Sequence, residues 1–472
     1  MLKSGFFAVR TIPALIAMSL SGYAGASGFQ LMEQNASGLG VAFAGSAAVA
    51  EDASTIFWNP AGMAYLPKGK MQVVGVLSAI KPSTRFSNDG SINPAGIYGA
   101  AGHGGDAGGW AYVPAMYFAM PVNEQISVGL GVNAPFGLAT EYDKGWTGRF
   151  RGLNSDVTTM NINPSISFKP NEEWAFGLGI SAMKLDGTFS NNVNASGALC
   201  SALQNPALCA PGGPPPAGAL RNLEGWARIV GDDWGWGYNL GAMFQPSPST
   251  RVGLSYRSAV DFKVTGDVKF WRPTVTTLTP GQNAQLNAVL AAGLRNGNVE
   301  SDIKLPDTAI LSAWQRLSDR WEMMGDISWT GWAKIQDLTF VRSDTGRTLS
   351  STEENWRNTW RVALGGAYQL DDQWKLRAGI AYDQSPVDSS EYRTPRLPDN
   401  DRTWLAIGAQ YKPTRELVFD AGYTYIWVKD SSINDSGGMN ATQAANVAAS
   451  GWLKGNYSNN VNILAVQATY SF

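Results

Sequence analysis

Apolar and polar side chains alternate along residues 461–472, the C-terminal end of the chain. One face carries Leu464, Val466, Ala468, Tyr470 and Phe472, and the opposite face carries Gln467, Thr469 and Ser471. Because successive side chains of a β-strand point to opposite sides, this period of two predicts a strand with one apolar surface. A last strand that is apolar on one side and ends on an aromatic residue is typical of outer-membrane barrels, although a strand of a soluble sandwich can look similar.

The same alternation recurs along the chain and is most regular at residues 354–369. There Trp356 and Trp360 share the predicted lipid-facing side, and Arg357 and Arg361 share the predicted lumenal side. With these residues and the C-terminal ones, fourteen segments show the pattern. The other segments begin near Met71, Trp110, Ile126, Thr158, Trp174, Trp234, Val252, Leu305, Trp321, Trp374, Trp404 and Leu417.

The connections between these segments alternate in length. Six are short and rich in Pro, Asn, Asp and Ser, which favour tight turns. Seven are long, at residues 83–109, 136–156, 187–233, 266–302, 335–353, 385–401 and 429–459. Bacterial outer-membrane barrels have even strand numbers, short periplasmic turns and long external loops. The sequence therefore predicts an all-β membrane protein, with a 14-stranded antiparallel transmembrane β-barrel over residues 69–472 and both termini on the periplasmic side.

Residues 1–26 have the features of a secretory signal peptide. Lys3 and Arg10 are basic, residues 12–20 are apolar, and residues 24–26 are small. The apolar run is too short for a membrane-spanning helix, and no later apolar run reaches the roughly 18 residues that such a helix needs. The mature chain is expected to be exported and to cross the membrane only with strands.

Composition agrees with an exported membrane barrel. Charged residues make up 16% of the chain, below the average of about 25% for soluble domains. The net charge of −2 gives no indication of nucleic-acid binding. Cys200 and Cys209 lie close together, so a disulfide is predicted in an oxidising compartment, with two free thiols as the alternative. A zinc site is not favoured, because His103 is the only histidine; no metal or other cofactor is expected.

Residues 27–68 precede the first predicted strand and are apolar, with many small residues and clear turn signals. A fourteen-stranded barrel encloses a lumen wider than its own inward side chains can fill, so an open one would leak. We therefore predict that residues 27–68 form a hatch, a plug inside the lumen. A periplasmic extension is the alternative, and the scarcity of charge in this segment argues against it.

Several short motifs make the prediction more specific. They are Gly28–Leu31, Ser37–Gly40, Asn59–Ala61, Gly137–Tyr142, Tyr256–Ser258, Asp383–Val387 and Pro398–Arg402. In these motifs the chain resembles the FadL-type family of outer-membrane transporters for long-chain fatty acids and other hydrophobic compounds. The resemblance extends from Ser27 to Phe472, and the long loops match least.

The resemblance implies a route for a ligand. In this family an external hydrophobic groove captures ligand, an internal pocket receives it, and a gap in the wall releases it sideways into the membrane. The gap lies at an inward kink of the third strand, beside the hatch residues that correspond here to Asn59, Pro60 and Ala61. The matching strand residues are Asn133, Ala134 and Pro135, and proline disrupts strand pairing because it lacks an N–H group. Alternatively, Pro135 only ends the strand before a loop.

The resemblance also implies ligand contacts. Phe29 and Leu31 are expected to touch the acyl chain, as N-terminal residues do in the family. Arg357 matches a basic residue that contacts the headgroup, and a guanidinium can hold a carboxylate with two hydrogen bonds. An inward arginine paired with carboxylates of the hatch or wall is an equal alternative for Arg357.

The external loops contain apolar residues, and residues 282–294 predict a helix with Leu286, Val289 and Leu290 on one face. Residues 441–452 predict a second short helix. Whether residues 187–233 and 266–302 form the capture groove, or pack against each other over the barrel mouth, stays open from the sequence.

The predicted function is passive uptake of long-chain fatty acids or other hydrophobic compounds, and uptake of aromatic hydrocarbons or alkanes is the alternative within the family. The expected partners are a hydrophobic small molecule and outer-membrane lipid, with the protein as a monomer. A general porin is disfavoured by the hatch. An outer-membrane lipase is disfavoured because its serine would need His103, which lies in a glycine-rich loop at residues 102–105, so no enzyme is expected.

Overall fold

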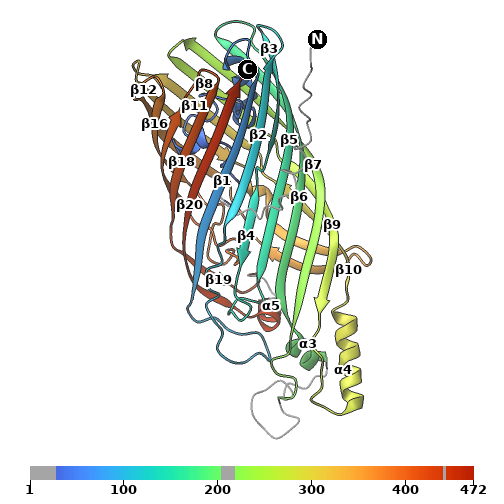
Figure 1. Ribbon diagram of the computed structural model, residues 1–472. Helices are drawn as coiled ribbons and strands as arrows, with labels where there is room; N and C mark the ends of the chain where they lie inside the picture. The colour runs from blue at the N-terminus through green and yellow to red at the C-terminus, as the bar shows by residue number, and fades with distance from the viewer. Residues whose placement is uncertain (1–27, 203–217, 439–442) are drawn as a thin grey trace, which may run out of the picture.

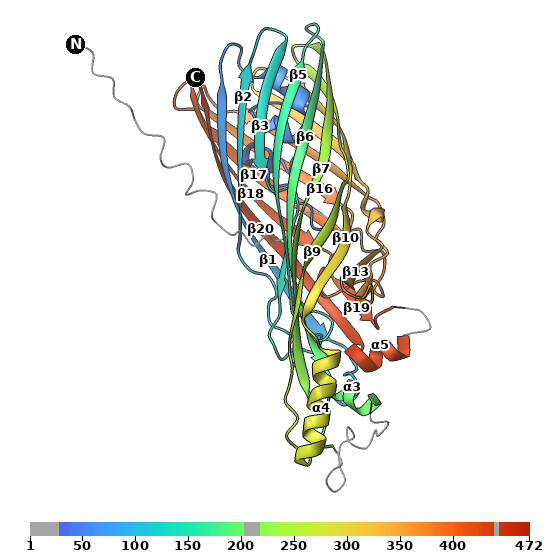
Figure 2. The same cartoon turned by 90° about the vertical axis from the view of Figure 1, so that its right-hand side faces the viewer.

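The computed structural model describes residues 28–202, 218–438 and 443–472. Its antiparallel strands form one closed barrel (Figures 1 and 2). The wall strands are β1 (Gln72–Asn88), β2 (Ala111–Pro121), β3 (Ile126–Asn133) with β4 (Gly137–Glu141), β5 (Asn154–Phe168), β6 (Trp174–Asn194), β7 (Glu224–Ser247), β8 (Thr250–Arg257) with β9 (Val260–Trp271), β10 (Gly297–Leu305) with β11 (Thr308–Arg316), β12 (Trp321–Thr330), β15 (Thr359–Gln369), β16 (Trp374–Asp383), β17 (Arg402–Tyr411), β18 (Leu417–Val428) and β20 (Leu453–Ser471). The predicted signal peptide lies outside the described residues.

The barrel closes where the first wall strand pairs with the last. The β1–β20 ladder runs without interruption from Gln72 opposite Ser471 to Asn88 opposite Gly455. Three of the wall strands are each interrupted and resume as a second segment, namely β3 and β4, β8 and β9, and β10 and β11. The predicted fourteen-stranded antiparallel barrel is confirmed.

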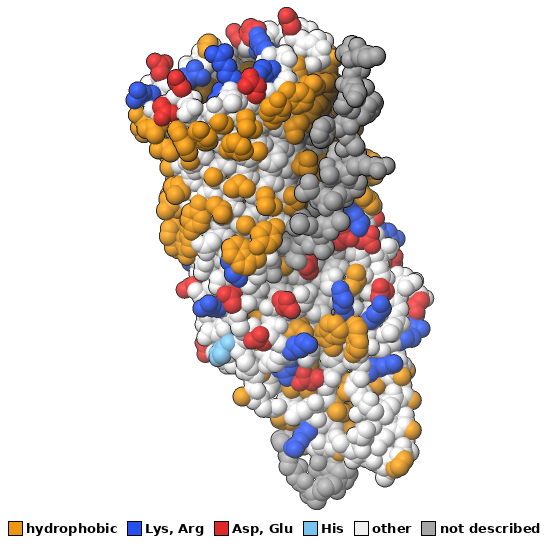
Figure 3. Space-filling model, viewed as in Figure 1, with side chains coloured by type: hydrophobic (Ala, Val, Ile, Leu, Met, Phe, Trp, Pro, Cys, Tyr) orange, Lys and Arg blue, Asp and Glu red, His pale blue; other side chains and the backbone are white. Residues whose placement is uncertain are grey.

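Alternation decides which side chains face outward. On β20, Leu464 is 53% exposed whereas Gln467 is 3% exposed, as the pattern of the last strand predicts. Figure 3 shows a broad band of apolar side chains across the face in view, with charged side chains gathered above and below it. The outer face therefore suits a bilayer. No helix within the described ranges combines the length and the apolar character needed to cross a membrane.

The strands continue past the apolar band on the side of the long loops. β6 ends at Asn194 and β7 begins at Glu224, so both extend into residues 187–233, where a loop was predicted. Exposed residues there include the charged Arg228 and Asp232 as well as Val230, while the inward Phe189 stays buried. Backbone pairing continues because it needs a partner strand rather than lipid. β13 (Asp337–Arg342), β14 (Thr348–Glu353) and β19 (Ser431–Asp435) belong to these outer loops.

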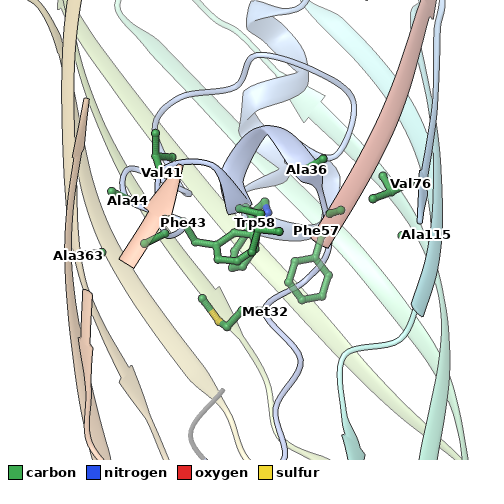
Figure 4. Packing of buried hydrophobic residues seen from close by; sticks show 14 of the residues in the cluster. Met32, Ala36, Val41, Phe43, Ala44, Phe57, Trp58, Val76, Ala115 and Ala363 are labelled. Carbon is green, nitrogen blue, oxygen red and sulfur yellow. The ribbon is translucent and has the colours of Figure 1, made fainter. Parts of the chain in front are cut away.

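Residues 28–68 lie inside the barrel, towards the end that carries the short turns (Figure 1). They contain α1 (Ala36–Leu39), α2 (Thr55–Trp58) and the 3-10 helix η2 (Pro60–Tyr65). Figure 4 shows Phe43 and Trp58 packed between strands of the wall. The Asn35 side chain caps α1 by accepting a hydrogen bond from the Gly38 N–H at 3.2 Å.

Small residues let this segment approach the wall closely. A Cβ atom placed on Gly40 would lie 2.9 Å from the Cα of Gly408 on β17, so neither position has room for a side chain. Hydrogen bonds add to the packing: the Ala36 N–H donates to Gln467 of β20 at 3.0 Å, and the Ser255 hydroxyl of β8 donates to the Trp58 carbonyl at 2.5 Å. The glycines of the N-terminal motif thus serve close packing against the wall.

Candidate ligand cavity and wall break

A cavity of about 880 Å³ lies beyond the N-terminal segment, on the side of the long loops. Its apolar lining comes from strands and loops far apart in the chain: Phe29, Leu138, Val157, Leu185, Phe189, Phe262, Ile303, Ile335, Leu338, Trp356 and Leu397. Cavities of this size and character are typical of small-molecule sites. Three other cavities in the described part of the chain are far smaller, at about 20 to 40 Å³.

Aromatic rings separate the cavity from the packed N-terminal segment. The Phe29 ring centroid lies 5.1 Å from that of Trp332, 5.8 Å from Phe136 and 5.9 Å from Trp356. Gly28, at φ +63°, gives the chain its turn here, and a Cβ atom on it would meet the Trp332 ring at 2.7 Å. Phe29 therefore reaches the cavity as expected, whereas Leu31 is buried below it among residues of the N-terminal segment.

Arg357 lies away from the cavity. Its side chain is 49% exposed and pairs with Asp388 at 3.0 Å, so the predicted inward orientation is wrong. β15 begins only at Thr359, so the alternation counted back from Trp360 does not extend to Arg357, whose N–H donates to the Pro386 carbonyl at 3.0 Å. The result is a reversal of the two faces: Trp356 points into the cavity and Arg357 points out.

Four basic side chains line the cavity, and Arg396 is the one without an ion pair among the described residues, whereas Lys263, Lys304 and Lys334 pair with carboxylates. Arg396 follows Pro395 in the loop after β16, lines the cavity and lies 5.4 Å from the Phe189 ring centroid. Its Nη1 donates to the Ser155 hydroxyl at 3.0 Å, and no carboxylate of the described residues lies within 4.0 Å of it. Burial lowers the pKa of Arg396 to about 10, so it remains charged at neutral pH.

Glu354 lines the same cavity and is buried. Its Oε2 accepts a hydrogen bond from the Trp356 indole N–H at 3.0 Å. Burial raises the pKa of Glu354 to about 8, although the positive charge of Arg396 acts in the opposite direction. At neutral pH the cavity thus presents the Arg396 cation beside a carboxyl group that is mostly protonated.

The motif Pro398–Arg402 holds the start of the described chain in place. Asp399 accepts from the Gly28 N–H at 3.0 Å, from the Ser385 hydroxyl at 2.9 Å and from Arg402 at 2.7 Å. These are charge-assisted hydrogen bonds in a buried site, which are stronger than neutral ones. They fix Phe29 at the boundary between the cavity and the packed segment.

The wall is broken at the predicted residues Asn133, Ala134 and Pro135. β3 ends at Asn133, and β4 resumes at Gly137 with its register on β5 shifted by one residue, so Pro135 interrupts the strand rather than ending it. On the other side, the β2–β3 ladder stops at Met116 opposite Val132. Within the described residues, β4 has no ladder with β2.

The N-terminal segment covers this break from inside. The Leu31 N–H donates to the Pro135 carbonyl at 2.8 Å, and the Gly137 N–H donates to the Phe29 carbonyl at 2.9 Å. The Gln34 side chain donates to the Ala134 carbonyl at 2.9 Å. Backbone groups that a neighbouring strand would satisfy are therefore satisfied by a segment that does not belong to the wall.

The hatch motif Asn59, Pro60 and Ala61 packs elsewhere on the wall. The Asn59 amide donates to the Ala47 carbonyl at 2.8 Å and to the Ala242 carbonyl of β7 at 3.2 Å. A Cβ atom on Gly241 of β7 would collide with this amide. The hydrogen bonds of Asn59 reach β7 and β8, and the helix η2 that begins with Pro60 and Ala61 also lies against β3, β5 and β6. No hydrogen bond joins the motif to Pro135 among the described residues.

The external helices are α3 (Ala195–Ala202), α4 (Pro280–Gly293) and α5 (Gln443–Ser450), close to the two predicted helices. Figure 2 shows α3 and α4 side by side at the far end of the molecule. Their apolar residues pack on one another, with Leu286 and Leu290 of α4 buried against Leu199 of α3, and we call this the loop-helix cluster. No described residue of this cluster lines the cavity, which favours packing over a capture groove. The predicted disulfide stays a prediction, because Cys209 lies outside the described residues.

The fold and the cavity define a class of protein. A closed barrel with an outer apolar band, a lumen occupied by its own N-terminal segment and a large apolar cavity is an outer-membrane β-barrel whose lumen is not an open aqueous channel. Residues 17–472 match the family described as outer membrane protein transport protein (OMPP1/FadL/TodX), and the chain belongs to this family. It is accordingly an outer-membrane protein of a family of transporters and channels.

Individual relatives agree with this assignment. The chain is 30% identical over 423 residues to a long-chain fatty acid transport protein of Salmonella typhi, covering 88% of this chain and 91% of the relative. It superimposes on the crystal structure of a Pseudomonas aeruginosa FadL homologue with a TM-score of 0.80 and 27% identity, covering 94% and 99% of the two chains. The Pseudomonas putida toluene transporter TodX, at 16% identity, a TM-score of 0.61 and coverage of 89% and 94%, shares the fold.

Proposed function

We propose that this protein takes up long-chain fatty acids passively across the outer membrane, with Arg396 holding the carboxylate in the apolar cavity. The observation that carries the proposal is that this guanidinium lines the cavity against the Phe189 ring and has no carboxylate within 4.0 Å among the described residues. A buried charge left without a counterion is costly, so the site favours a ligand that brings an anion attached to an apolar chain. The relative from Salmonella typhi, named a long-chain fatty acid transport protein, supports the same substrate class.

Residues 27–68 act as the hatch in this proposal. They fill the lumen towards the short turns, so solutes cannot diffuse straight through. A single chain closes the barrel, so the protein is proposed to act as a monomer, with both termini on the periplasmic side.

The proposed exit is sideways, through the wall break at Asn133, Ala134 and Pro135. Each CH₂ group kept out of water is worth about 0.8 kcal/mol, so a long acyl chain resists release into the aqueous periplasm. Passage into the membrane avoids that cost and needs no energy source if the ligand is consumed afterwards. The support for this route is that two backbone hydrogen bonds and one from Gln34 close the break, and a small shift of the N-terminal segment would break all three.

Uptake of aromatic hydrocarbons is the second candidate. The likeness to the toluene transporter TodX shows the fold alone, at 16% identity. Toluene has no anion to pair with Arg396, and the cavity of about 880 Å³ has room for a much longer molecule. These two observations rank the fatty acid first.

The direct test compares growth of a deletion strain, with and without the gene on a plasmid, on oleate and on toluene as carbon sources. The proposal expects the gene to restore growth on oleate. Growth restored on toluene alone would instead support uptake of aromatic hydrocarbons. Large, steady conductance steps in planar bilayers would instead indicate an open porin.

A further inference from the structure

A buried cluster of aromatic rings packs at the end of the barrel that carries the long loops. Tyr142 and Trp146 stack at 4.0 Å in a buried apolar cluster with Tyr457, and Trp146 is fully buried. The Tyr142 hydroxyl donates to the Pro395 carbonyl at 2.8 Å, directly beside the loop that carries Arg396. None of these three rings lines the cavity. A ligand arriving along the axis would have to break this packing.

Beside the cavity, the backbone ladder between β10 and the loop strand β13 is incomplete, and we call this interval the opening. Apolar side chains of both edges, such as Ile303 and Leu338, belong to one hydrophobic cluster there. The β10–β13 ladder has only two residue pairs, Val299 opposite Arg342 and Glu300 opposite Val341. At the other end, the Gly331 N–H donates to the Asp307 carbonyl at 2.9 Å. Between these two ties, no backbone hydrogen bond among the described residues joins 301–306 to 332–340. Figure 2 places the labels of β10 and β13 next to each other on this side of the barrel.

The cavity reaches both edges of this opening. Asp302, Ile303 and Lys304 line it on β10, and Ile335, Asp337 and Leu338 line it on the opposite edge. It also touches Asp261 and Lys263 of β9, whose side chains are 73% and 70% exposed on the outer surface. The cavity therefore reaches exposed charged side chains of the wall as well as both edges of the opening.

The opening lies directly beyond the apolar band. On β8 and β11, the strands that continue into β9 and β10, Leu254 and Leu311 are exposed to lipid. The outward residues of β9 and β10 are charged instead, with Lys304 paired to Asp261 at 2.9 Å and Lys263 to Glu300 at 3.7 Å. An amphiphile at the membrane surface meets polar groups for its headgroup and an apolar cavity for its chain at the same level.

We propose that a single-chain anionic amphiphile enters the cavity sideways, from the membrane surface through the opening between β10 and β13, without crossing the loop-helix cluster. This inference rests on the proposed function, because it specifies how the proposed ligand reaches Arg396. In this proposal the β13–β14 hairpin forms the edge of the entrance opposite β10. The proposal also separates entry from exit, since the break at Pro135 lies in a different part of the wall.

The experiment closes the opening with a covalent bridge. Cysteines replace Asp302 and Asp337, on opposite edges, in a background in which Cys200 and Cys209 are serine, and a short bismaleimide joins them. The matched control pair is Asn298→Cys with Ser343→Cys, which bridges the same strands beyond the opening, where the Ser343 N–H donates to the Asn298 carbonyl at 3.2 Å. Neither control residue lines the cavity. Heat-modifiable mobility in gels checks that each barrel is folded.

Uptake of radiolabelled oleate by cells is the readout. The bridge across the opening is expected to remove most of the initial uptake rate, and the control bridge to leave it unchanged. Unchanged uptake with the opening bridged, or equal losses with both bridges, overturns the inference. If the double variant does not fold, Asp337→Cys alone, modified with a bulky maleimide, must slow uptake in the same way.

A second arm tests the competing entrance. Replacing residues 280–293 of α4 with a short glycine-serine linker is expected to leave oleate uptake intact, whereas its loss would assign entry to the loop-helix cluster and overturn the inference. A failure of the proposed function gives a different result. In that case the Cys200→Ser, Cys209→Ser background without any bridge takes up no oleate, and the inference is overturned together with the proposed function.

Discussion

The two halves of the lumen are built from different kinds of contact. Towards the short turns, the N-terminal segment leaves only small voids of about 30 and 40 Å³ and is tied to the wall by ion pairs. Glu51 pairs with Arg377 of β16 at 2.7 Å, and Arg377 also pairs with Asp420 of β18 at 2.7 Å. Towards the long loops, the lumen holds the apolar cavity of about 880 Å³, and its Arg396 has no ionic partner within the described residues.

The half filled by the N-terminal segment closes the lumen, and the half with the cavity has room for a ligand. The ion pairs that Arg377 makes with Glu51 and Asp420 favour one arrangement of this segment, because removing Arg377 leaves both carboxylates without that partner. A buried charge without a partner does the opposite: it stabilises the state in which a ligand supplies the missing anion. The break at Pro135 lies where the two halves meet, and the N-terminal segment contributes both to the plug and, through Phe29, to the cavity.

The largest effect is expected from closing the wall break at Pro135, which lies where the two halves meet. A bismaleimide bridge between Ala134→Cys and Ala115→Cys of β2 should reduce oleate uptake to the background of the deletion strain, because the acyl chain then has no lateral exit. The control is Phe118→Cys with Leu130→Cys, which are already paired in the β2–β3 ladder, so a bridge there should leave uptake unchanged. Full uptake with the first bridge in place contradicts the lateral route.

The next effect concerns the plugged half. Arg377→Met leaves Glu51 and Asp420 buried without their shared partner, which should lower the free energy of unfolding by about 3–5 kcal/mol. Urea titration of the folded barrel in micelles, followed by gel mobility, measures it. Arg415→Met, at an exposed turn, is the matched control and should leave the midpoint in place. An equal midpoint in both variants would show that the ion pairs do not hold the plug.

A smaller effect is expected in the hollow half. Arg396→Met should weaken binding of oleate to the purified protein by about tenfold to a hundredfold, since a hydrogen bond to a charged group is worth about 1.5–3 kcal/mol. Binding of oleyl alcohol, which has no carboxylate, should change far less. Arg357→Met is the control, because Arg357 is exposed and paired with Asp388. A loss of oleate affinity in the Arg357 variant alone would restore the original assignment of the headgroup contact.

The smallest effect is a pH dependence. Burial raises the pKa of Glu354 to about 8 from its ordinary value of 4.5, so the folded protein keeps this proton up to about pH 8. The stability that the proton contributes is complete below pH 4.5 and is lost as the pH rises from 4.5 to about 8. Above pH 8 the new anion competes with the ligand carboxylate for Arg396. Oleate should therefore bind more weakly at pH 9 than at pH 7, as measured by equilibrium titration. Glu354→Gln should flatten this difference, and a difference that persists in that variant would assign the titration to another group.

The cavity residues show where sequence reasoning stops. Phe29 was found through a motif, but Trp332, Glu354, Trp356 and Arg396 were missed. The only local signal for Arg396 was its position between Pro395 and Pro398, which restrict the backbone of a loop next to the recognised Pro398–Arg402 motif. Arg357 was misplaced because the alternation was extended beyond the first residue of β15, Thr359, into residues that are not part of the strand.

The sequence by itself determined the barrel, its strand number and the alternation of loops and turns, because a period of two on a lipid-facing strand is a local property repeated fourteen times. It also located the break at Pro135, since a missing N–H is a property of one residue. Only the tertiary structure decided which loop side chains reach the cavity, that the loop-helix cluster packs on itself, and that the backbone ladder between β10 and β13 is incomplete. Those features depend on contacts between segments hundreds of residues apart, and no periodic pattern constrains where an irregular loop places its side chains.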